Sequence, residues 1–277
     1  MRAKFIQLFA LIAVLAPFTG VANLALAAQT PPGATFTVDP AALPQVSERA
    51  REIYRLGLAL GNNPQAFSKV GDCLSVPPFF LAGFENPRIY RLGSDYAYLQ
   101  EAIGYFAGSF ARPSQAARIG FTVNSALDPG RADGPLCRRG ESPLACEYRL
   151  NRPSFAFISL GTNGDWLTDA QYEHGLRQII TFTVESGVVP ILATKADDLD
   201  GGRFNRIVRA LAAEYQLPLW DYRLAVEALP NHGLQADGAH LQWAPSYFDD
   251  PSRIWSGWQL RNLTALQALD RVWRGVR

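Results

Sequence analysis

Residues 66–75 read AFSKVGDCLS, a short apolar run that ends in a glycine, an aspartate and a cysteine. The run has the length and composition of a buried strand, and Gly71 marks the turn that follows it. Similar runs recur along the chain, and longer segments with helical spacing separate them. We predict strands over residues 66–70, 119–123, 155–160, 188–193 and 217–220. This alternation predicts an α/β fold with a mainly parallel five-stranded sheet covered on both faces.

Helices are predicted over residues 46–60, 94–106, 168–187 and 204–215, with a last one opening at Ser256. Two of them begin with a capping box, in which a hydroxyl residue precedes a glutamine by three positions. These pairs are Thr168 with Gln171 and Ser256 with Gln259.

The N-terminal stretch predicts a secretory signal peptide over residues 1–27. Arg2 and Lys4 precede an apolar run and then a small-residue segment that ends at Ala27 and Ala28. A membrane anchor is the alternative, but Pro17 interrupts the run, which is shorter than the roughly 20 residues of a spanning helix. We expect a secreted or periplasmic protein, with a flexible Pro- and Ala-rich linker at 28–45 and a single domain at 46–277.

The composition excludes several classes of protein. The 277 residues are 48% hydrophobic and 18% charged, enough for a large core and unlike a disordered or fibrous chain. The 26 basic and 25 acidic residues are scattered, so no one-sided basic patch predicts binding to nucleic acid or to anionic lipid. We expect neither a nucleic-acid partner nor a stable membrane anchor.

The three cysteines fall into a near pair and a single residue. Cys137 and Cys146 lie in a segment that reads as a polar loop, and in a secreted protein this spacing predicts a disulfide. Cys73 is left as a free thiol, and a lone buried cysteine is ordinarily a small hydrophobic residue.

Polar clusters follow the predicted strands. They comprise Gly71 to Ser75, Gly120, Gly161 to Asn163, and Asp237 to His240 near the end of the chain. Because the carboxyl ends of parallel strands meet at one edge of a sheet, we expect these clusters to converge there.

Asp237 and His240 are spaced so that the carboxylate can orient the imidazole, leaving the other ring nitrogen to act as a general base. A solvated loop pair that arises by chance is the alternative. Of the other histidines, His174 is expected on an exposed helix face, and His232 has no aspartate at comparable spacing.

Asn163 follows a strand at a position where a side-chain amide can donate to an oxyanion. Turn formation explains the residue equally well, because Asn tolerates left-handed backbone. Gly120 has a similar alternative, since a glycine can simply permit close packing.

These clusters, in this order, resemble the blocks of the SGNH or GDSL hydrolase family, from G-D-C-L-S at Gly71 to D-x-x-H at His240. The resemblance implies a flavodoxin-like three-layer α/β/α sandwich and ester hydrolysis without a cofactor or metal. It also implies that His240 is the base and Asp237 its orienter. The implied oxyanion donors are the backbone N–H of Cys73, Gly120 and the amide of Asn163.

The sequence departs from this family at the nucleophile, because Cys73 stands where the family has serine. A cysteine near His240 can be an activated thiolate, or it can be inactive if sulfur is misplaced in a site shaped for oxygen. Ser75 is the nearest hydroxyl, but two positions along a helical turn it should face away from whatever Cys73 faces.

The sequence therefore predicts a secreted hydrolase of carbonyl esters that uses Cys73, His240 and Asp237, with an acylated saccharide as one candidate substrate. A catalytically inactive protein that binds a glycan or another ligand in the same pocket is the alternative. Aromatic residues crowd the segment after His240 and suit either a substrate wall or core packing. They are Trp243, Tyr247, Phe248, Trp255 and Trp258.

Overall fold

Four parallel strands form the central sheet of the computed structural model, in the order β1, β3, β4, β5. The structure describes residues 37–197 and 201–277, so the predicted signal peptide at 1–27 and part of the predicted linker lie outside it. The strands are β1 (Asn63–Gly71), β3 (Pro153–Ser159), β4 (Val189–Ala193) and β5 (Leu219–Trp220). A separate parallel pair, β2 (Tyr90–Arg91) and β6 (Ser246–Tyr247), lies outside this sheet.

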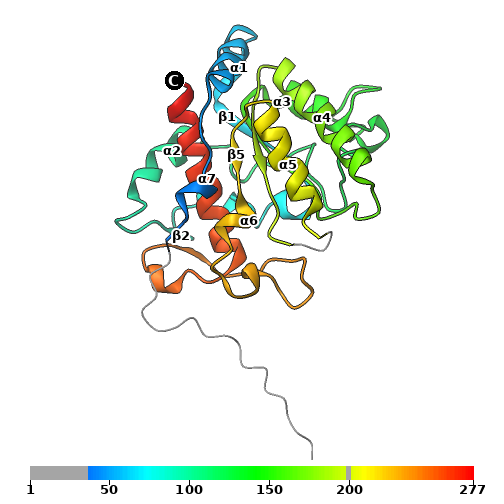
Figure 1. Cartoon of the computed structure of the whole chain (residues 1–277). Helices are drawn as coiled ribbons and strands as arrows, with labels where there is room; N and C mark the ends of the chain where they lie inside the picture. Colours follow the sequence, from blue (N-terminus) through cyan, green and yellow to red (C-terminus); the bar gives the residue numbers. More distant parts are fainter. Residues whose placement is uncertain (1–36, 198–200) are drawn as a thin grey trace, which may run out of the picture.

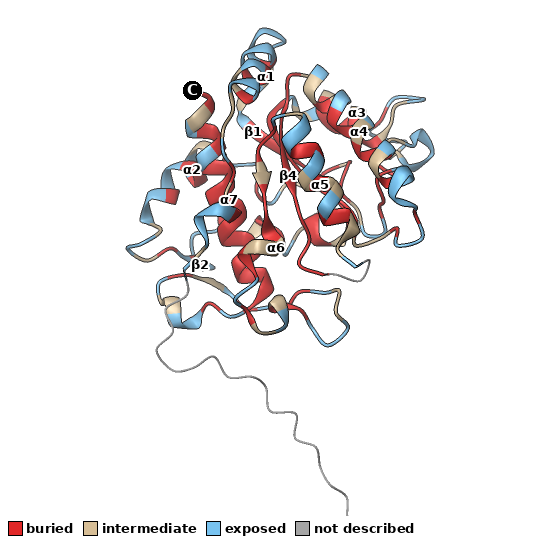
Figure 2. Ribbon diagram, viewed as in Figure 1, coloured by how far each residue is buried: buried red, intermediate tan, exposed pale blue. Residues whose placement is uncertain are grey.

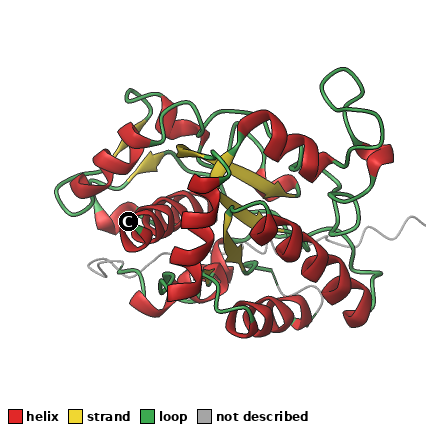
Figure 3. Cartoon of the chain, turned by 90° about the horizontal axis from the view of Figure 1, so that it is seen from above, coloured by secondary structure: helices red, strands yellow, loops and turns green. Residues whose placement is uncertain are grey.

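Helices cover both faces of the sheet, which confirms the predicted three-layer α/β class (Figures 1 and 3). One face carries α1 (Glu48–Ala59), α2 (Gln100–Tyr105) and α7 (Gly257–Val276), and the other carries α3 (Pro143–Asn151), α4 (Asp169–Glu185) and α5 (Arg203–Glu214). The short α6 (Tyr222–Ala225) follows β5. Both predicted capping boxes are present, at the starts of α4 and α7.

The core between the layers is largely aromatic. Every residue of β3 is buried, and Phe67 of β1 makes edge contacts with the rings of Phe106, Phe110 and Phe157. Burying a phenylalanine side chain contributes about 1.5–3 kcal/mol, so this cluster is a main source of stability. Helix α7 is buried along most of its length (Figure 2).

The predicted strand at 119–123 is wrong, and the sheet therefore has four strands instead of five. Ala117 alone forms a parallel bridge, to Gly71. The chain then turns at Gly120, whose φ of 82° is left-handed, so it leaves the extended conformation. Ile119 consequently lies 78% exposed at the edge of the sheet.

Two other segments differ from the sequence-based expectation. Cys146 lies in helix α3 and not in a polar loop, and Ser142 caps this helix by accepting from the backbone N–H of Ala145. Residues 37–45, predicted as part of the linker, lie against the domain: Ala42 is fully buried and its carbonyl accepts from the N–H of Asp221.

Candidate active site

The ends of β1 and β3 bring two of the predicted clusters together. Gly71 pairs in register with Ser159, so the residues that follow both strands emerge side by side. The Asp72 carboxylate is buried and accepts from the N–H groups of Gly161 (3.1 Å) and Thr162 (3.0 Å), and it also caps the turn by accepting from Leu74 (3.0 Å). Asp72 thus ties the Cys73 turn to the loop that carries Asn163.

The turn itself, η2 (Cys73–Ser75), leaves no room for a side chain at Gly71. A Cβ there would lie 2.1 Å from Oγ of Ser75. Ser75 is 1% exposed and donates to the carbonyl of Ser159 (3.3 Å), so its hydroxyl is not available as a nucleophile. Cys73 and Leu74 of this turn line a cavity, and of the two only Cys73 carries a nucleophilic group.

Asp237 and His240 form the pair that their spacing predicts. Oδ2 of Asp237 lies 2.6 Å from Nδ1 of His240, and Oδ1 accepts from the backbone N–H groups of Ala239 and His240 (both 3.0 Å). These hydrogen bonds, led by the backbone N–H of His240, lower the pKa of Asp237 to about 2. The carboxylate is therefore ionised at neutral pH, and Nε2 of the imidazole is left free for a reacting group.

The loop that carries His240 is fixed against the start of α7. A Cβ at Gly233 would lie 2.6 Å from Cα of Gly257, so the two backbones touch there. Leu234 and Leu241 form an antiparallel bridge across the loop, and the hydroxyl of Tyr222 donates to the carbonyl of Gly257 (2.7 Å). The position of His240 is thus set by backbone contacts with the last helix.

Cys73 and His240 line the same cavity, of about 460 Å³, although 167 positions separate them in the sequence. The rest of its wall is mainly apolar and includes Phe79, Ile119 and Trp243, which are 46%, 78% and 60% exposed at its rim. A neighbouring cavity of about 440 Å³ shares Phe79 and Trp243 with it.

The aromatic residues after His240 do not all have the same environment, and Trp255 is 45% exposed. Trp243 and Trp258 line the cavity, and Trp258 also stacks on Phe79. Phe248 packs in the core instead.

Burial controls the chemistry of the Cys73 thiol. It raises the pKa of Cys73 to about 11; the negative charge of Asp72 adds to this effect, while Arg261 and Asn163 oppose it. The resting thiol is therefore protonated at neutral pH. The structure therefore does not favour the preformed thiolate that was one of the two sequence-based alternatives for Cys73.

The three predicted oxyanion donors have no other acceptor among the described residues. The backbone N–H groups of Cys73 and Gly120 donate to no other residue within 37–197 and 201–277, and that of Cys73 faces its own thiol. Nδ2 of Asn163 is buried and makes no hydrogen bond of adequate geometry, and the amide lies close enough to Cys73 to lower the pKa of its thiol. Gly161 and Gly164 take the left-handed positions of this turn, so Asn163 does not.

The disulfide prediction is confirmed, since Cys137 and Cys146 are bonded and Cys73 is a free cysteine. Glu141 lies near the bonded pair, but disulfide sulfurs offer no thiolate to a metal ion. His174 is exposed on α4, as expected, and His232 lies 4.0 Å from Glu227. Neither histidine lines the cavity of Cys73.

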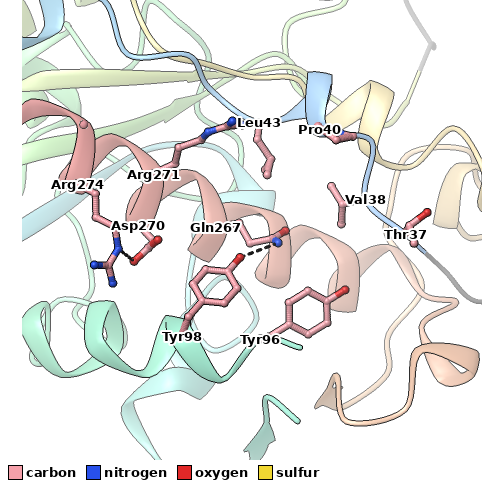
Figure 4. Close-up of a pocket in the computed structure, with 11 residues that line it drawn as sticks. Thr37, Val38, Pro40, Leu43, Tyr96, Tyr98, Gln267, Asp270, Arg271 and Arg274 are labelled. Atoms are coloured by element: carbon pink, nitrogen blue, oxygen red, sulfur yellow. Dashed lines mark hydrogen bonds and ion pairs between the residues drawn. The ribbon is translucent and has the colours of Figure 1, made fainter. Parts of the chain in front are cut away.

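A larger cavity, of about 680 Å³, lies along the second half of α7 (Figure 4). Tyr96 and Tyr98 face Gln267 there, and Nε2 of Gln267 donates to the hydroxyl of Tyr98 (3.2 Å). No cysteine or histidine is among the described residues that line it, so it is not the cavity of the predicted triad.

The sequence did not predict the importance of Asp72 and Arg261. The sequence does place Asp72 directly after a predicted buried strand. A carboxylate at such a position needs hydrogen-bond donors, and this signal could have pointed to its contacts. Arg261 lies in the first half of α7, and no local pattern distinguishes it from the exposed arginines of that helix.

No protein-family model matches this sequence, and no match is found among curated proteins. Solved structures similar to this chain include TesA (20% identity, TM-score 0.41, covering 76% of this chain and 95% of the other). Another is a catalytic mutant of Axe2, an acetylxylan esterase from Geobacillus stearothermophilus (15% identity, TM-score 0.46, covering 75% of this chain and 95% of the other). A third is a GDSL-like lipase from Bacteroides thetaiotaomicron (12% identity, TM-score 0.44, covering 80% of this chain and 97% of the other). Because identity and TM-score are low, we infer no activity from these similarities.

Within residues 37–197 and 201–277, no helix combines the length and apolar character needed to cross a bilayer.

Proposed function

We propose that this chain is a secreted ester hydrolase of the SGNH or GDSL type in which Cys73, His240 and Asp237 form the catalytic triad. One observation carries the proposal: Cys73 and His240 face one cavity, and Asp237 holds the histidine ring by its Nδ1. Covalent hydrolysis needs a nucleophile, a base and an orienter at one cavity, and this arrangement supports the proposal.

In the proposed reaction, His240 takes the thiol proton as the sulfur of Cys73 attacks the ester carbonyl carbon. The negative oxygen that forms is bound by the N–H groups of Cys73 and Gly120 and by the amide of Asn163. The carbon–oxygen bond then breaks, and the alcohol leaves with the proton from His240. Water attacks the resulting thioester, gives a proton to His240, and the carboxylic acid is released as the thiol regains that proton.

The neutral resting thiol fits this order of events. With a pKa of about 11, Cys73 cannot supply much thiolate at pH 7, so its proton must pass to His240 during the attack. Serine hydrolases solve the same problem in this way, because a hydroxyl is also neutral before it reacts.

The cavity wall indicates the kind of ester. Its apolar part, formed by Ile119, Leu241 and Trp258, suits an acyl group next to Cys73. Trp243 is 60% exposed at the rim and offers a ring face on which a saccharide alcohol can stack. An acylated saccharide therefore remains our candidate substrate.

One observation favours a non-catalytic alternative, a protein that binds a glycan or another ligand in this cavity. A thiol with a raised pKa is a poor nucleophile unless the base is well placed, and the substitution of cysteine for serine weakens the expectation of turnover. The paired Asp237 and His240 argue the other way, because a binding pocket has no evident need for an oriented base.

The test is a hydrolysis screen of p-nitrophenyl acyl esters and acetylated oligosaccharides with the wild-type protein, Cys73→Ala and Cys73→Ser. We expect Cys73→Ala to lower kcat by about 1000-fold or more and Cys73→Ser to keep or raise it. His174→Ala is the matched control for hydrolysis by exposed imidazole, since His174 lies on the surface of α4. Equal turnover by the wild-type protein and Cys73→Ala would refute the triad, and turnover by neither would favour the binding protein.

A further inference from the structure

Arg261 is a fully buried arginine in the first half of α7. Its guanidinium packs against the rings of Phe80, Trp220 and Tyr222, with centroid distances of 4.8, 5.0 and 5.0 Å. Arginine is almost never fully buried unless it is paired, so this position calls for an explanation.

The guanidinium reaches the turn that carries the candidate nucleophile. Its Nε donates to the carbonyl of Leu74 (3.0 Å), the residue after Cys73, and Nη2 donates to the hydroxyl of Ser159 (2.9 Å) at the end of β3. Arg261 therefore joins α7 to the ends of both strands beneath the cavity. Nη1 is buried and has no hydrogen-bond partner.

The charge of Arg261 is not neutralised by direct contact with a carboxylate. Among the described residues, no carboxylate lies within 4.0 Å of the guanidinium. The titratable groups that face it are Asp72 and Cys73 from the turn, Asp197 from the loop after β4, and Tyr222 of α6. A buried cation without a contact ion pair is costly, and it stabilises negative charge that forms nearby.

We propose that Arg261 is a positioning residue of the active site, which fixes the turn beneath Cys73 and favours negative charge at its sulfur. The inference rests on the proposed function, because it assigns Arg261 to the reaction of Cys73. In the proposed mechanism, water adds to the thioester and the resulting tetrahedral intermediate expels the sulfur. Negative charge develops on the sulfur in that step. A fixed positive charge below the turn stabilises that state without reorganisation.

The test measures the thiol directly, so it does not depend on turnover. Cys73 is the one free thiol beside the Cys137–Cys146 disulfide, and its rate of alkylation by iodoacetamide follows the fraction of thiolate. We expect Arg261→Met to raise the thiol pKa by about one unit and slow alkylation at pH 8.5 about tenfold. Arg261→Lys keeps the charge. The logarithm of its alkylation rate should therefore lie at least halfway from the Arg261→Met value to the wild-type value.

A matched control separates charge from general loosening of the turn. Asn262 is the next residue of α7, and its amide holds the backbone of Phe79 (3.0 Å) and Leu81 (2.8 Å) without a charge. Asn262→Ala should lower the thermal midpoint of unfolding while leaving the alkylation profile unchanged. The proposal is overturned if folded Arg261→Met reacts like the wild-type protein, or if Arg261→Lys is slowed as much as Arg261→Met.

Ser159→Ala keeps the proposal testable if Arg261→Met does not fold. This variant removes one of the two hydrogen bonds that orient the guanidinium and leaves the charge in place. We expect alkylation about threefold slower, and an unchanged rate would overturn the proposal. A protein that hydrolyses no ester but shows these shifts would refute the proposed function and still confirm the effect of Arg261 on the sulfur.

Discussion

Replacing Asn163 by alanine should lower activity without lowering stability. Nδ2 of Asn163 is buried and has no hydrogen-bond partner in the resting protein, which is the state expected of a donor that waits for an oxyanion. If the function of Asn163 were only to form the turn, its side-chain amide would be expected to donate to a group within that turn. The two interpretations of Asn163 therefore predict opposite effects on the free energy of unfolding.

The magnitudes follow from that unpaired amide. A buried donor without a partner costs about 1–3 kcal/mol, so its removal should leave the free energy of unfolding unchanged or raise it by up to about 1 kcal/mol. Loss of one oxyanion donor costs about 2.7 kcal/mol in the transition state, which is about 100-fold in kcat. KM should change little, because the donor acts mainly on the transition state.

The assay combines urea unfolding with steady-state hydrolysis of the best p-nitrophenyl ester. Asn205→Ala is the matched control: Asn205 is also a buried asparagine, but its amide is fully used, accepting from the N–H of Lys195 (2.7 Å) and donating to its carbonyl (3.0 Å). We expect Asn205→Ala to lose about 1–3 kcal/mol of stability. A similar loss in Asn163→Ala with unchanged kcat would show that Asn163 only forms the turn.

Two further predictions concern the loop that carries the base. Gly233→Ala would place a Cβ 2.6 Å from the backbone of α7, so it should cost about 1–3 kcal/mol in urea unfolding and lower kcat, whereas Gly104→Ala, which meets open space, should do neither. Lost stability with full activity would contradict the idea that this contact positions His240. Because the folded pKa of Asp237 is lowered to about 2 from 3.8, its contribution to stability is complete above about pH 4 and disappears as the pH falls towards 2. Asp237→Asn should therefore lose less stability than the wild-type protein between pH 4 and pH 2, and equal losses would refute the hydrogen-bonded carboxylate.

Local signals in the sequence were sufficient to predict most of the helices and strands of the fold. The capping boxes at Thr168 and Ser256 predicted the starts of α4 and α7, because an N-cap is a contact between residues three positions apart. Helix α3 was missed although Ser142 and Pro143 carry the same kind of signal. The strand at 119–123 was wrong because apolar composition does not reveal the left-handed turn at Gly120.

The candidate site was predictable where its residues are close in sequence or follow strand ends. The spacing of Asp237 and His240 predicted their hydrogen bond, and the order of the strands predicted that Asn163 would lie near Cys73. Arg261 could not be predicted, because its contact with Leu74 spans 187 positions and depends on how α7 packs against the sheet. The pKa of Cys73 was missed for the same reason, since burial is a property of the assembled layers.

The packing of α7 has a consequence for the order in which the protein matures. This helix forms the support of the His240 loop at one end and anchors the Cys73 turn through Arg261, and it is synthesised after both of these residues. A growing polypeptide that already contains Cys73 and His240 cannot bring them together correctly until α7 docks. The proposed ester-cleaving chemistry would then begin only after α7 has docked, and until that point Cys73 would be an ordinary cysteine of an unfolded segment.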